Sequence, residues 1–501
     1  MMKTCVIIGG GLGGLFCGAL LAKNGIKVTV LEKNYIIGGG LQCFKRNNVF
    51  FETGMHTLGG FLPGGNLYQI CNYLGILDRL SIQHIDPNCV DEIRIKEGSK
   101  CYVLPSGKER FIKTLIKYFP HEEEGIRSYV EEIFKLTEEI PLFYLKEDRP
   151  LLVSHSQKFF WSVDRLISHY IKDVNLRNLL AYMSPLYGGI KGETPAYVHA
   201  LINVFYLNGV SRFIGGSMQL TNALKEIIES NGGKVMNKSE VKYIDITSSL
   251  INFIETSDSK KYSADYYVSA ISPTALLNIV KPGALGKLYE KRISEIPVSY
   301  SAFSVFIEFF PKTFKFFDHT GHYHSNFEDI WGPNKRNNNN FIGSLYFITP
   351  PDHRNQSYAN RMIVISVMNF DEVSKWADSK VGKRPKDYYK WKDEKTKQIL
   401  NILEELYPGF KQCVKNIEAG SPLTIRDFYN SKEGSLYGFR KDCEDIFQSQ
   451  ISVKTKIKNL FLTGQNIILH GICGVPLTAI ITAESILGEN IILNQLNKNE
   501  N

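Results

Sequence analysis

The amino-acid sequence predicts an α/β fold in which a dinucleotide-binding domain is interrupted by an α+β substrate domain with an antiparallel sheet. Three observations support this prediction. A strand, a glycine turn, a helix and a second strand follow one another in residues 6–32. Short apolar strands beside glycines return later in the chain. Helical and then aromatic, β-rich stretches separate these returns. The predicted parts are residues 1–90, 211–280 and 421–501 for the first domain, and residues 91–210 and 281–420 for the second.

The N-terminal unit carries the pattern G-x-G-x-x-G at Gly9, Gly11 and Gly14, directly after an apolar strand. In dinucleotide-binding folds the first glycine allows a tight turn, the second lets a pyrophosphate approach the backbone, and the third lets the helix pack on the strand. Glu32 ends the second strand, about 20 residues further on, where the acid that binds a ribose hydroxyl is expected. This order predicts dinucleotide binding; a glycine turn without a ligand is the alternative.

A second glycine loop at residues 38–40 suggests that two loops approach the same phosphates. A helix is expected over residues 66–77. Residues 90–200 contain charged helical segments and aromatic turns without a second βαβ unit, so we expect a mostly helical part of another domain. The first domain should resume in residues 214–270, with a helix whose apolar stripe includes Leu220 and Leu224, followed by short strands.

The C-terminal half should contain one antiparallel sheet and a return to the first domain. Residues 300–310, 341–349 and 362–368 are β-rich and aromatic, and residues 337–340 form a polar loop between two of these stretches. The remaining expected elements are an amphipathic helix over 392–407, a strand in K-N-L-F-L-T-G-Q, and a final helix over 477–487.

Composition narrows the function classes. The net charge of +8 is spread along the 501 residues, which favours a solvated surface over a membrane contact and argues against nucleic-acid binding. The nine cysteines have no paired C-x-x-C spacing, so we expect neither a metal site nor a disulfide framework, and a reduced, cytoplasmic location. No apolar run has the length of a membrane-spanning helix.

With these pieces placed, the chain resembles the FAD-dependent phytoene desaturase superfamily, which has the glutathione-reductase/amine-oxidase type of fold. The branch that it resembles most contains carotenoid isomerases and all-trans-retinol saturases. Four stretches carry the resemblance over nearly the whole chain: G-G-G-L-G-G-L with Glu32, G-G-G…F-E-T-G-M-H at 38–56, S-P-L-T…E-G-S-L-Y-G at 421–438, and L-T-G-Q…G-I-C-G-V-P at 462–476.

The resemblance implies FAD as the cofactor and assigns its contacts. The three glycines of the first loop would hold the pyrophosphate, Glu32 the adenosine ribose, and the second loop the phosphates or ribityl chain. The C-terminal residues would run along the ribityl chain and the flavin ring, at a helix N-terminus suited to the ring's N1–C2=O end. The remaining implied contacts are Gly39 and Gly40, Val241 and Ala270 near adenine, Gly464 and Gln465, and Gly474, Val475 and Leu477.

Two departures from the family pattern affect these assignments. Many amine oxidases have an arginine after the second glycine pair, whereas this chain has Leu41, so the pyrophosphate contact must come from the backbone, Lys45 or Arg46. Most relatives have Gly-Asp at the C-terminal site, and this chain has a glutamine at 465, as the retinol saturase branch does. A glutamine can still form a hydrogen bond with a ribityl hydroxyl.

Three side chains are candidates for proton transfer. His56 in T-G-M-H could donate a proton near the flavin, although a structural histidine in a turn is the commoner case. His470 is a weaker candidate, and Tyr437 is either an acid or, more commonly, a wall of the substrate tunnel. Cys43 and Cys473 could attach a flavin covalently but are more commonly buried apolar residues. The aromatic residues 159–161 and 314–317 are expected in the core, with a membrane-dipping rim as the alternative.

These features predict an FAD-dependent oxidoreductase that transfers hydride between flavin N5 and C=C or CH–CH bonds of an apolar, carotenoid- or retinoid-like substrate. The sequence leaves saturation, desaturation and isomerisation open. It also leaves open the electron partner, which is a quinone, oxygen or a reduced nicotinamide, and a peripheral contact with the cytoplasmic membrane face. The alternatives are an amine oxidase-like flavoenzyme and a non-redox carrier of prenylated lipids.

Overall fold

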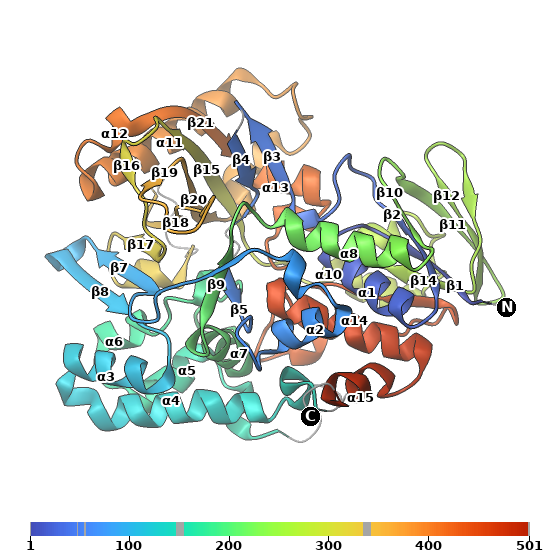
Figure 1. The fold of residues 1–501 in the computed structure, drawn as a ribbon, viewed down its shortest axis with the longest axis horizontal. Helices are drawn as coiled ribbons and strands as arrows, with labels where there is room; N and C mark the ends of the chain where they lie inside the picture. The colour runs from blue at the N-terminus through green and yellow to red at the C-terminus, as the bar shows by residue number, and fades with distance from the viewer. Residues whose placement is uncertain (1, 48, 55–56, 147–154, 334–341, 499–501) are drawn as a thin grey trace.

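Two sheets in opposite halves of the molecule organise the computed structural model, which describes residues 2–47, 49–54, 57–146, 155–333 and 342–498 (Figure 1). One is a five-stranded parallel sheet and the other a seven-stranded mixed sheet. The five-stranded sheet has the order β10 (Lys234–Met236), β2 (Lys27–Leu31), β1 (Thr4–Ile8), β14 (Tyr266–Ser269) and β22 (Leu460–Leu462). The seven-stranded sheet has the order β21 (Val414–Gly420), β15 (Ser301–Phe309), β20 (Arg361–Met368), β18 (Ser344–Ile348), β17 (Thr320–His324), β7 (Asp91–Ile95) and β8 (Lys100–Leu104).

Smaller sheets and helices complete the described fold. The remaining strands are β11 (Val241–Thr247), β12 (Leu250–Thr256) and β13 (Lys261–Tyr262); β16 (Phe314–Lys315) and β19 (Tyr358–Ala359); β3 (Cys43–Arg46) and β4 (Val49–Glu52); and β5 (Thr57–Gly59), β9 (Val210–Phe213) and β6 (Ile82–His84). The helices are α1 (Leu12–Lys23), α2 (Asn66–Leu74), α3 (Lys108–Tyr118), α4 (Glu123–Glu138), α5 (Val163–Tyr170), α6 (Val174–Leu179), α7 (Ala196–Leu207), α8 (Met218–Ser230), α9 (Pro273–Leu277), α10 (Lys287–Glu295), α11 (Lys386–Leu406), α12 (Phe410–Cys413), α13 (Pro422–Tyr429), α14 (Gly471–Leu487) and α15 (Ile491–Lys498).

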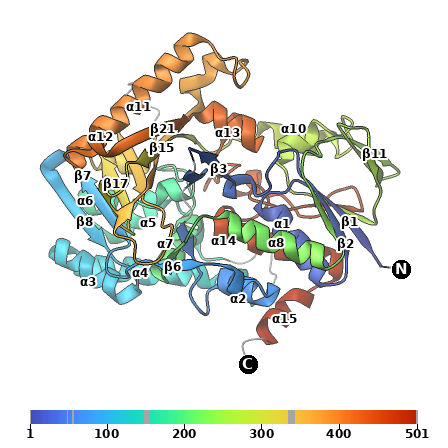
Figure 2. The same ribbon diagram turned by 45° about the horizontal axis from the view of Figure 1, so that its top comes forward.

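The parallel sheet is assembled from three stretches that lie far apart in the sequence. Strands β1 and β2 come from the N-terminus, β10 and β14 from the middle of the chain, and β22 from the C-terminal part. Its central strands are apolar because helices cover them, and α1 packs against both α8 and α14 (Figure 2). The predicted return of the first domain's strands is thus confirmed, while the exact domain boundaries stay a prediction.

The seven-stranded sheet differs from the prediction in two ways. It is not purely antiparallel, because β17 pairs in parallel with β7. In addition, β7 and β8 come from the stretch predicted to be mostly helical. In the sequence of β7, D-E-I-R-I, charged and apolar residues alternate only over the last four positions, which is too short a pattern to stand out between long helices. The three predicted aromatic strands do pair in this sheet as β15, β18 and β20, and the predicted polar loop at 337–340 lies outside the described residues.

Helix ends also depart from the prediction where the backbone decides them. Helix α2 stops at Leu74 instead of 77, because Gly75 adopts a left-handed conformation with φ of 73°. Helix α11 begins at Lys386, directly after Pro385, instead of at 392. Helix α14 begins at Gly471 instead of 477 and accommodates Pro476 near its start, and α15 was not predicted. The predicted α1, β2 and α8 are confirmed.

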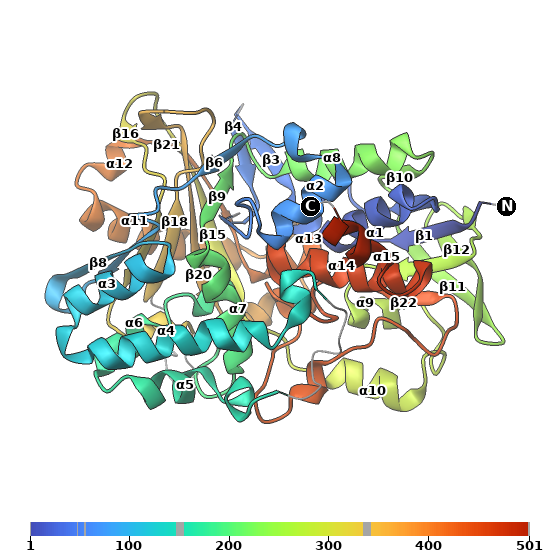
Figure 3. The same ribbon diagram turned by 60° about the horizontal axis from the view of Figure 1, so that its bottom comes forward.

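Apolar side chains fill two main cores. One lies beneath α11, where Trp391 and Leu403 pack on the outer face of the seven-stranded sheet. The other joins the parallel sheet to helices α3–α7, on the opposite side of the seven-stranded sheet from α11 (Figures 1 and 3). Phe159 and Phe314 are buried in these cores, which confirms the core interpretation of the two aromatic stretches.

No single helix in the described part of the chain is both long and apolar enough to cross a membrane. Helices α14 and α15 reach that length and composition only when they are taken together, and they are bent by 120° relative to each other.

Candidate flavin site and adjoining pocket

The two N-terminal glycine loops lie against each other. The backbone N–H of Gly38 donates to the carbonyl of Gly10 at 2.7 Å, and Gly11 and Gly38 form a parallel bridge. The third glycine of the pattern is fixed by sterics, since a Cβ atom on Gly14 would lie 2.1 Å from the carbonyl oxygen of Gly9. The first loop and the second loop therefore face one common space at the start of α1, as the sequence suggested.

Glu32 is buried at the end of β2, where its carboxylate closes the first loop. One carboxylate oxygen accepts from the N–H of Gly10 and the other from the N–H of Asn34, each at 2.8 Å. The carbonyl of Glu32 also accepts from the N–H of Ser239 at 2.7 Å, which brings the start of β11, with Val241, to the same end of the sheet.

Ala270 reaches this site from β14. Its N–H donates to the carbonyl of Ile8 at 2.9 Å, and a Cβ on Gly14 would lie 3.1 Å from its methyl group. The adjoining Ile271 side chain comes within 2.9 Å of the position of a Cβ on Gly9. Ala270 therefore lies directly beside the first loop.

The C-terminal segment packs on the same helix start. A Cβ on Gly13 would lie 2.8 Å from the Cα of Gly464 and 3.4 Å from a methyl of Val475. Residue Gln465 follows, partly buried, and α14 then begins at Gly471 with His470 as its N-cap. Gly474 and Leu477 are buried inside the first two turns of α14, so they lie deeper in the helix than the predicted start at 477 implied.

At four glycines from distant segments next to this junction, a Cβ atom would fit without a clash. A Cβ on Gly11 or Gly40 would find its nearest atom 3.9 Å away, one on Gly464 would find it at 3.7 Å, and one on Gly471 would meet nothing within 4 Å. No side chain caps the start of α1, so its first N–H groups remain available to an anion. The backbone arrangement therefore fits an extended dinucleotide with a pyrophosphate at α1.

Lys45 and Arg46, the side chains considered as substitutes for the missing arginine, are directed elsewhere. Both are exposed on the β3–β4 hairpin. The ammonium group of Lys45 lies 5.3 Å from the ring centroid of Phe50, and the Arg46 guanidinium forms an ion pair with Glu418 at 3.3 Å. Of the three possible sources of a pyrophosphate contact named above, the backbone is the one that remains.

Of the three candidate proton-transfer residues, the structure describes two, and these two lie close together. His56 lies outside the described residues, so its role stays a prediction. The Tyr437 ring lies over Gly188 and near His470, with 5.4 Å between the two ring centroids. Burial, and secondarily Lys441, lowers the pKa of His470 to about 3, so the imidazole is neutral near neutral pH. Burial raises the pKa of Tyr437, so its phenol keeps its proton.

The two cysteines near the glycine loops are protonated thiols. Cys473 donates to the carbonyl of Gly59 at 2.9 Å, and burial raises its pKa to about 12. Burial also raises the pKa of Cys43, whose sulfur lies 3.8 Å from the hydroxyl of Ser217. A protonated thiol is a poor nucleophile, which favours the interpretation of both as buried apolar residues.

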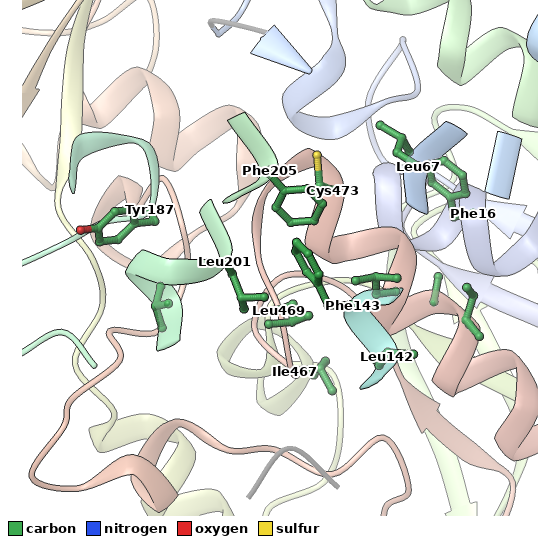
Figure 4. Close-up of a cluster of buried hydrophobic side chains, with 14 of the residues drawn as sticks. Phe16, Leu67, Leu142, Phe143, Tyr187, Leu201, Phe205, Ile467, Leu469 and Cys473 are labelled. Atoms are coloured by element: carbon green, nitrogen blue, oxygen red, sulfur yellow. The ribbon is translucent and has the colours of Figure 1, made fainter. Parts of the chain in front are cut away.

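An apolar pocket opens beside the start of α14. Figure 4 shows Leu201 and Phe205 of α7 facing Leu469 and Cys473. The side chains of Phe143 and Phe205 pack with their ring centroids 4.4 Å apart. The lining residues are Tyr197, Val198, Leu201, Ile202, Phe205, Lys441, Ile468, Leu469, His470 and Gly474. This lining is of the kind that an apolar ligand needs next to the cofactor space, but the pocket itself encloses only about 20 Å³.

Lys441 is a charged residue of this lining that the sequence analysis missed. Its side chain is buried, and its ammonium group donates to the carbonyl of Ser449 at 3.3 Å. Burial lowers its pKa to about 8. Nothing in the local sequence G-F-R-K-D-C separates this lysine from a surface residue, because its burial arises from packing against α7 and the segment before α14.

Comparison with known proteins agrees with this geometry. The model of the family described as flavin containing amine oxidoreductase matches residues 12–487. The chain belongs to this family. It is an FAD-dependent oxidoreductase.

Individual relatives are distant but cover most of the chain. The all-trans-retinol 13,14-reductase of Danio rerio is 26% identical, over 97% of this chain and 86% of its own length. Prolycopene isomerase 1 of an Oncidium hybrid cultivar is 25% identical, over 86% of this chain and 74% of its own length. The structure of an oxidoreductase from Methanosarcina mazei superposes with a TM-score of 0.65 at 18% identity, covering 96% of this chain and all of that one, which shows a shared fold.

Proposed function

We propose that this flavoenzyme transfers hydride to or from C=C or CH–CH bonds of an apolar, polyisoprenoid substrate. The observation that carries the proposal is the pocket beside the start of α14, because α7 lines it with Val198, Leu201, Ile202 and Phe205 and no carboxylate is among its lining residues. The names of the relatives point the same way, since retinol and prolycopene are both polyenes.

The proposed FAD contacts are the residues that the family resemblance assigns to the cofactor and that the structure brings together around the glycine loops. Gly9, Gly11 and Gly14 position the pyrophosphate at the start of α1, and Glu32 binds the adenosine ribose. When bound, FAD supplies the hydride-exchanging position N5. The other proposed contacts are Gly39, Gly40, Val241, Ala270, Gly464, Gln465, Gly474, Val475 and Leu477.

The proton that accompanies hydride transfer needs a group that keeps its proton at neutral pH. Tyr437 meets this condition because burial raises its pKa. His470 is neutral and its Nε2 has no partner among the described residues, so it suits a hydrogen-bonding role better than that of an acid. We therefore propose Tyr437 as either the proton donor or a wall of the substrate tunnel. A Tyr437→Phe variant separates the two, because only loss of a donor lowers kcat while leaving KM nearly unchanged.

The test of the proposed function uses the flavin itself. The purified protein should carry about one FAD per chain by absorbance, and the photoreduced protein should be reoxidised, without oxygen, by a conjugated polyene. A desaturase would instead be reduced by a saturated substrate, so the direction emerges from the same spectra. A prenyl-lipid carrier would bind the polyene without any change in the flavin spectrum. Reduction by amines together with inertness toward polyenes would overturn the proposal in favour of an amine oxidase.

The electron partner and the surroundings of the enzyme belong to the proposal as well. A quinone, oxygen or a reduced nicotinamide can each complete the redox cycle, and stopped-flow mixing of each with the photoreduced or oxidised protein would identify it. An apolar substrate favours a peripheral contact with a membrane. Co-sedimentation with anionic vesicles would test that contact.

A further inference from the structure

The inner face of the seven-stranded sheet carries buried polar side chains that the proposed hydride transfer does not use. We call four of them the polar patch: Asp91 on β7, His322 and His324 on β17, and Tyr346 on β18. All four are at least 95% buried. His322 and His324 are two positions apart on one strand and so lie on the same face, and His322 pairs across the strands with Tyr346. The opposite face of the same strands is apolar and packs beneath α11.

Besides one carboxyl oxygen of Asp91, three atoms of the polar patch have no hydrogen-bond partner within the described ranges: Nδ1 of His322, Nε2 of His324 and the hydroxyl of Tyr346. The Tyr346 ring lies near both imidazoles, at 5.2 Å and 5.7 Å from their centroids. A buried polar group without a partner is unfavourable, so several in one cluster favour a polar ligand. The described residues contain no group of three or more His, Cys, Asp or Glu side chains that could hold a metal ion.

The hydrogen bonds around His324 fix its tautomer. The hydroxyl of Ser344 donates its single proton to the carbonyl of Asp329 at 2.8 Å. The same hydroxyl must therefore accept from Nδ1–H of His324, which lies 2.9 Å away. Burial lowers the pKa of His324 well below its usual value, so the ring is neutral and Nε2 is an acceptor.

The other two groups complete a donor–acceptor set. Burial raises the pKa of Tyr346, so its phenol is protonated and can donate. Nε2 of His322 faces the Asp91 carboxylate at 2.8 Å and donates to it. The polar patch therefore offers a donor at Tyr346, an acceptor at His324 and a carboxyl group at Asp91.

The chain around Tyr437 connects the proposed reaction site to the seven-stranded sheet. Tyr437 lies next to His470 at the start of α14, and the N–H of the preceding Leu436 donates to the carbonyl of Tyr300, directly before β15, at 3.1 Å. A ligand that reaches from the start of α14 to the inner face of the sheet would thus pass Tyr437 on its way.

We propose that the polar patch binds the oxygen-bearing end of the substrate and that this end is a neutral alcohol. This inference rests on the proposed function, since it assigns the second end of the same elongated substrate. Among a hydroxyl, a carboxylate and a hydrocarbon end, the hydroxyl alone donates to Nε2 of His324 and accepts from Tyr346 at once. A carboxylate has no proton for His324 and would lie near the carboxyl group of Asp91, and a hydrocarbon end would leave both of these atoms unpartnered.

Arg212 is a nearby group that could favour a carboxylate instead. Its guanidinium donates to the carbonyls of Asp318 and His319 and to the hydroxyl of Thr320. Its Nε has no partner among the described residues, so a preference for the acid is a defined competing outcome.

The test measures equilibrium binding to the oxidised holoenzyme by quenching of tryptophan fluorescence. The ligands are all-trans-retinol, the corresponding carboxylic acid, and the hydrocarbon in which a methyl group replaces the hydroxymethyl group, all delivered in one detergent. We expect the alcohol to bind at least tenfold more tightly than either analogue. Because no turnover is required, this result is independent of whether the proposed redox reaction occurs.

Two matched variants test which tyrosine hydroxyl binds the alcohol end of the ligand. Tyr346→Phe removes the proposed donor and should reduce the alcohol-to-hydrocarbon affinity ratio about tenfold. Tyr323→Phe removes an equally buried, unpartnered hydroxyl from the opposite face of the neighbouring strand and should leave that ratio unchanged. The inference would be overturned if the two variants had equal alcohol-to-hydrocarbon affinity ratios. It would also be overturned if the unmodified enzyme bound the acid or the hydrocarbon more tightly than the alcohol, or bound none of the three ligands.

Discussion

The two halves of the molecule prepare for ligands in opposite ways. Around the parallel sheet, the start of α1 is surrounded by backbone and by glycines; at some of these a Cβ would clash with backbone, and at others it would fit. The inner face of the seven-stranded sheet instead carries tyrosines, histidines and an aspartate that are buried with unmet hydrogen bonds. Backbone recognises what all dinucleotides share, and side chains recognise what distinguishes one substrate from another. The following variants, ordered by expected effect, test this contrast.

Gly14→Ala should have the largest effect, because it places a methyl group against backbone in the cofactor half. The new Cβ would lie 2.1 Å from the carbonyl of Gly9, so α1 and β1 could not pack as they do. We expect a destabilisation of more than about 3 kcal/mol, measured as a loss of folded apoprotein in thermal melts. Gly420→Ala is the control, since its Cβ finds its nearest atom at 3.8 Å. A stable Gly14→Ala variant would show that the loop is less constrained than described.

Lys441→Met tests the cost of a charged side chain that is buried in the pocket beside the start of α14. The lysine pKa is about 8 in the folded protein against 10.5 for an ordinary lysine, so the unfolded chain binds more protons between these pH values. Stability of the unmodified protein should therefore rise from pH 8 to 10.5, and the burial penalty below pH 8 amounts to up to about 3 kcal/mol. Melting of both proteins across this range should show the variant more stable at pH 7 and the difference vanishing near pH 10.5. A difference that does not change with pH would contradict the assignment.

Gly11→Ala separates cofactor binding from folding in the backbone-lined half. The added methyl group would meet no atom closer than 3.9 Å, so the apoprotein should melt like the unmodified one. The methyl group would nevertheless occupy the space through which a pyrophosphate approaches α1. We expect at least tenfold weaker FAD binding to the apoprotein by fluorescence titration. Unchanged affinity would place the pyrophosphate elsewhere.

Arg46→Ala should have the smallest effect. The guanidinium is exposed and pairs with Glu418, and exposed ion pairs contribute less than about 1 kcal/mol. FAD occupancy and the melting temperature should both stay close to those of the unmodified protein. A marked loss of FAD would restore the alternative in which this arginine contacts the pyrophosphate.

The sequence predicted the cofactor half well because its signals are local. The glycine spacing, the apolar β1 and the acid at the end of β2 follow one another within one stretch of chain, and each constrains its neighbours. The substrate half was predicted less well. The T-G-H-Y-H alternation of β17 places two histidines on one face, a signal that was present but not used. Strands β7 and β8 were missed because their place in the sheet depends on pairing with β17, far away in the sequence.

By itself, the sequence determined the glycine turn at the start of α1, where a dinucleotide is expected to bind, because the turn geometry there depends on residues within a single βαβ unit. Only the tertiary structure decided which side chains are buried beside it. Lys441, Arg212 and Tyr346 look like ordinary surface or strand residues in the chain. Their altered acidity and missing partners arise when helices and strands from distant segments remove water from them.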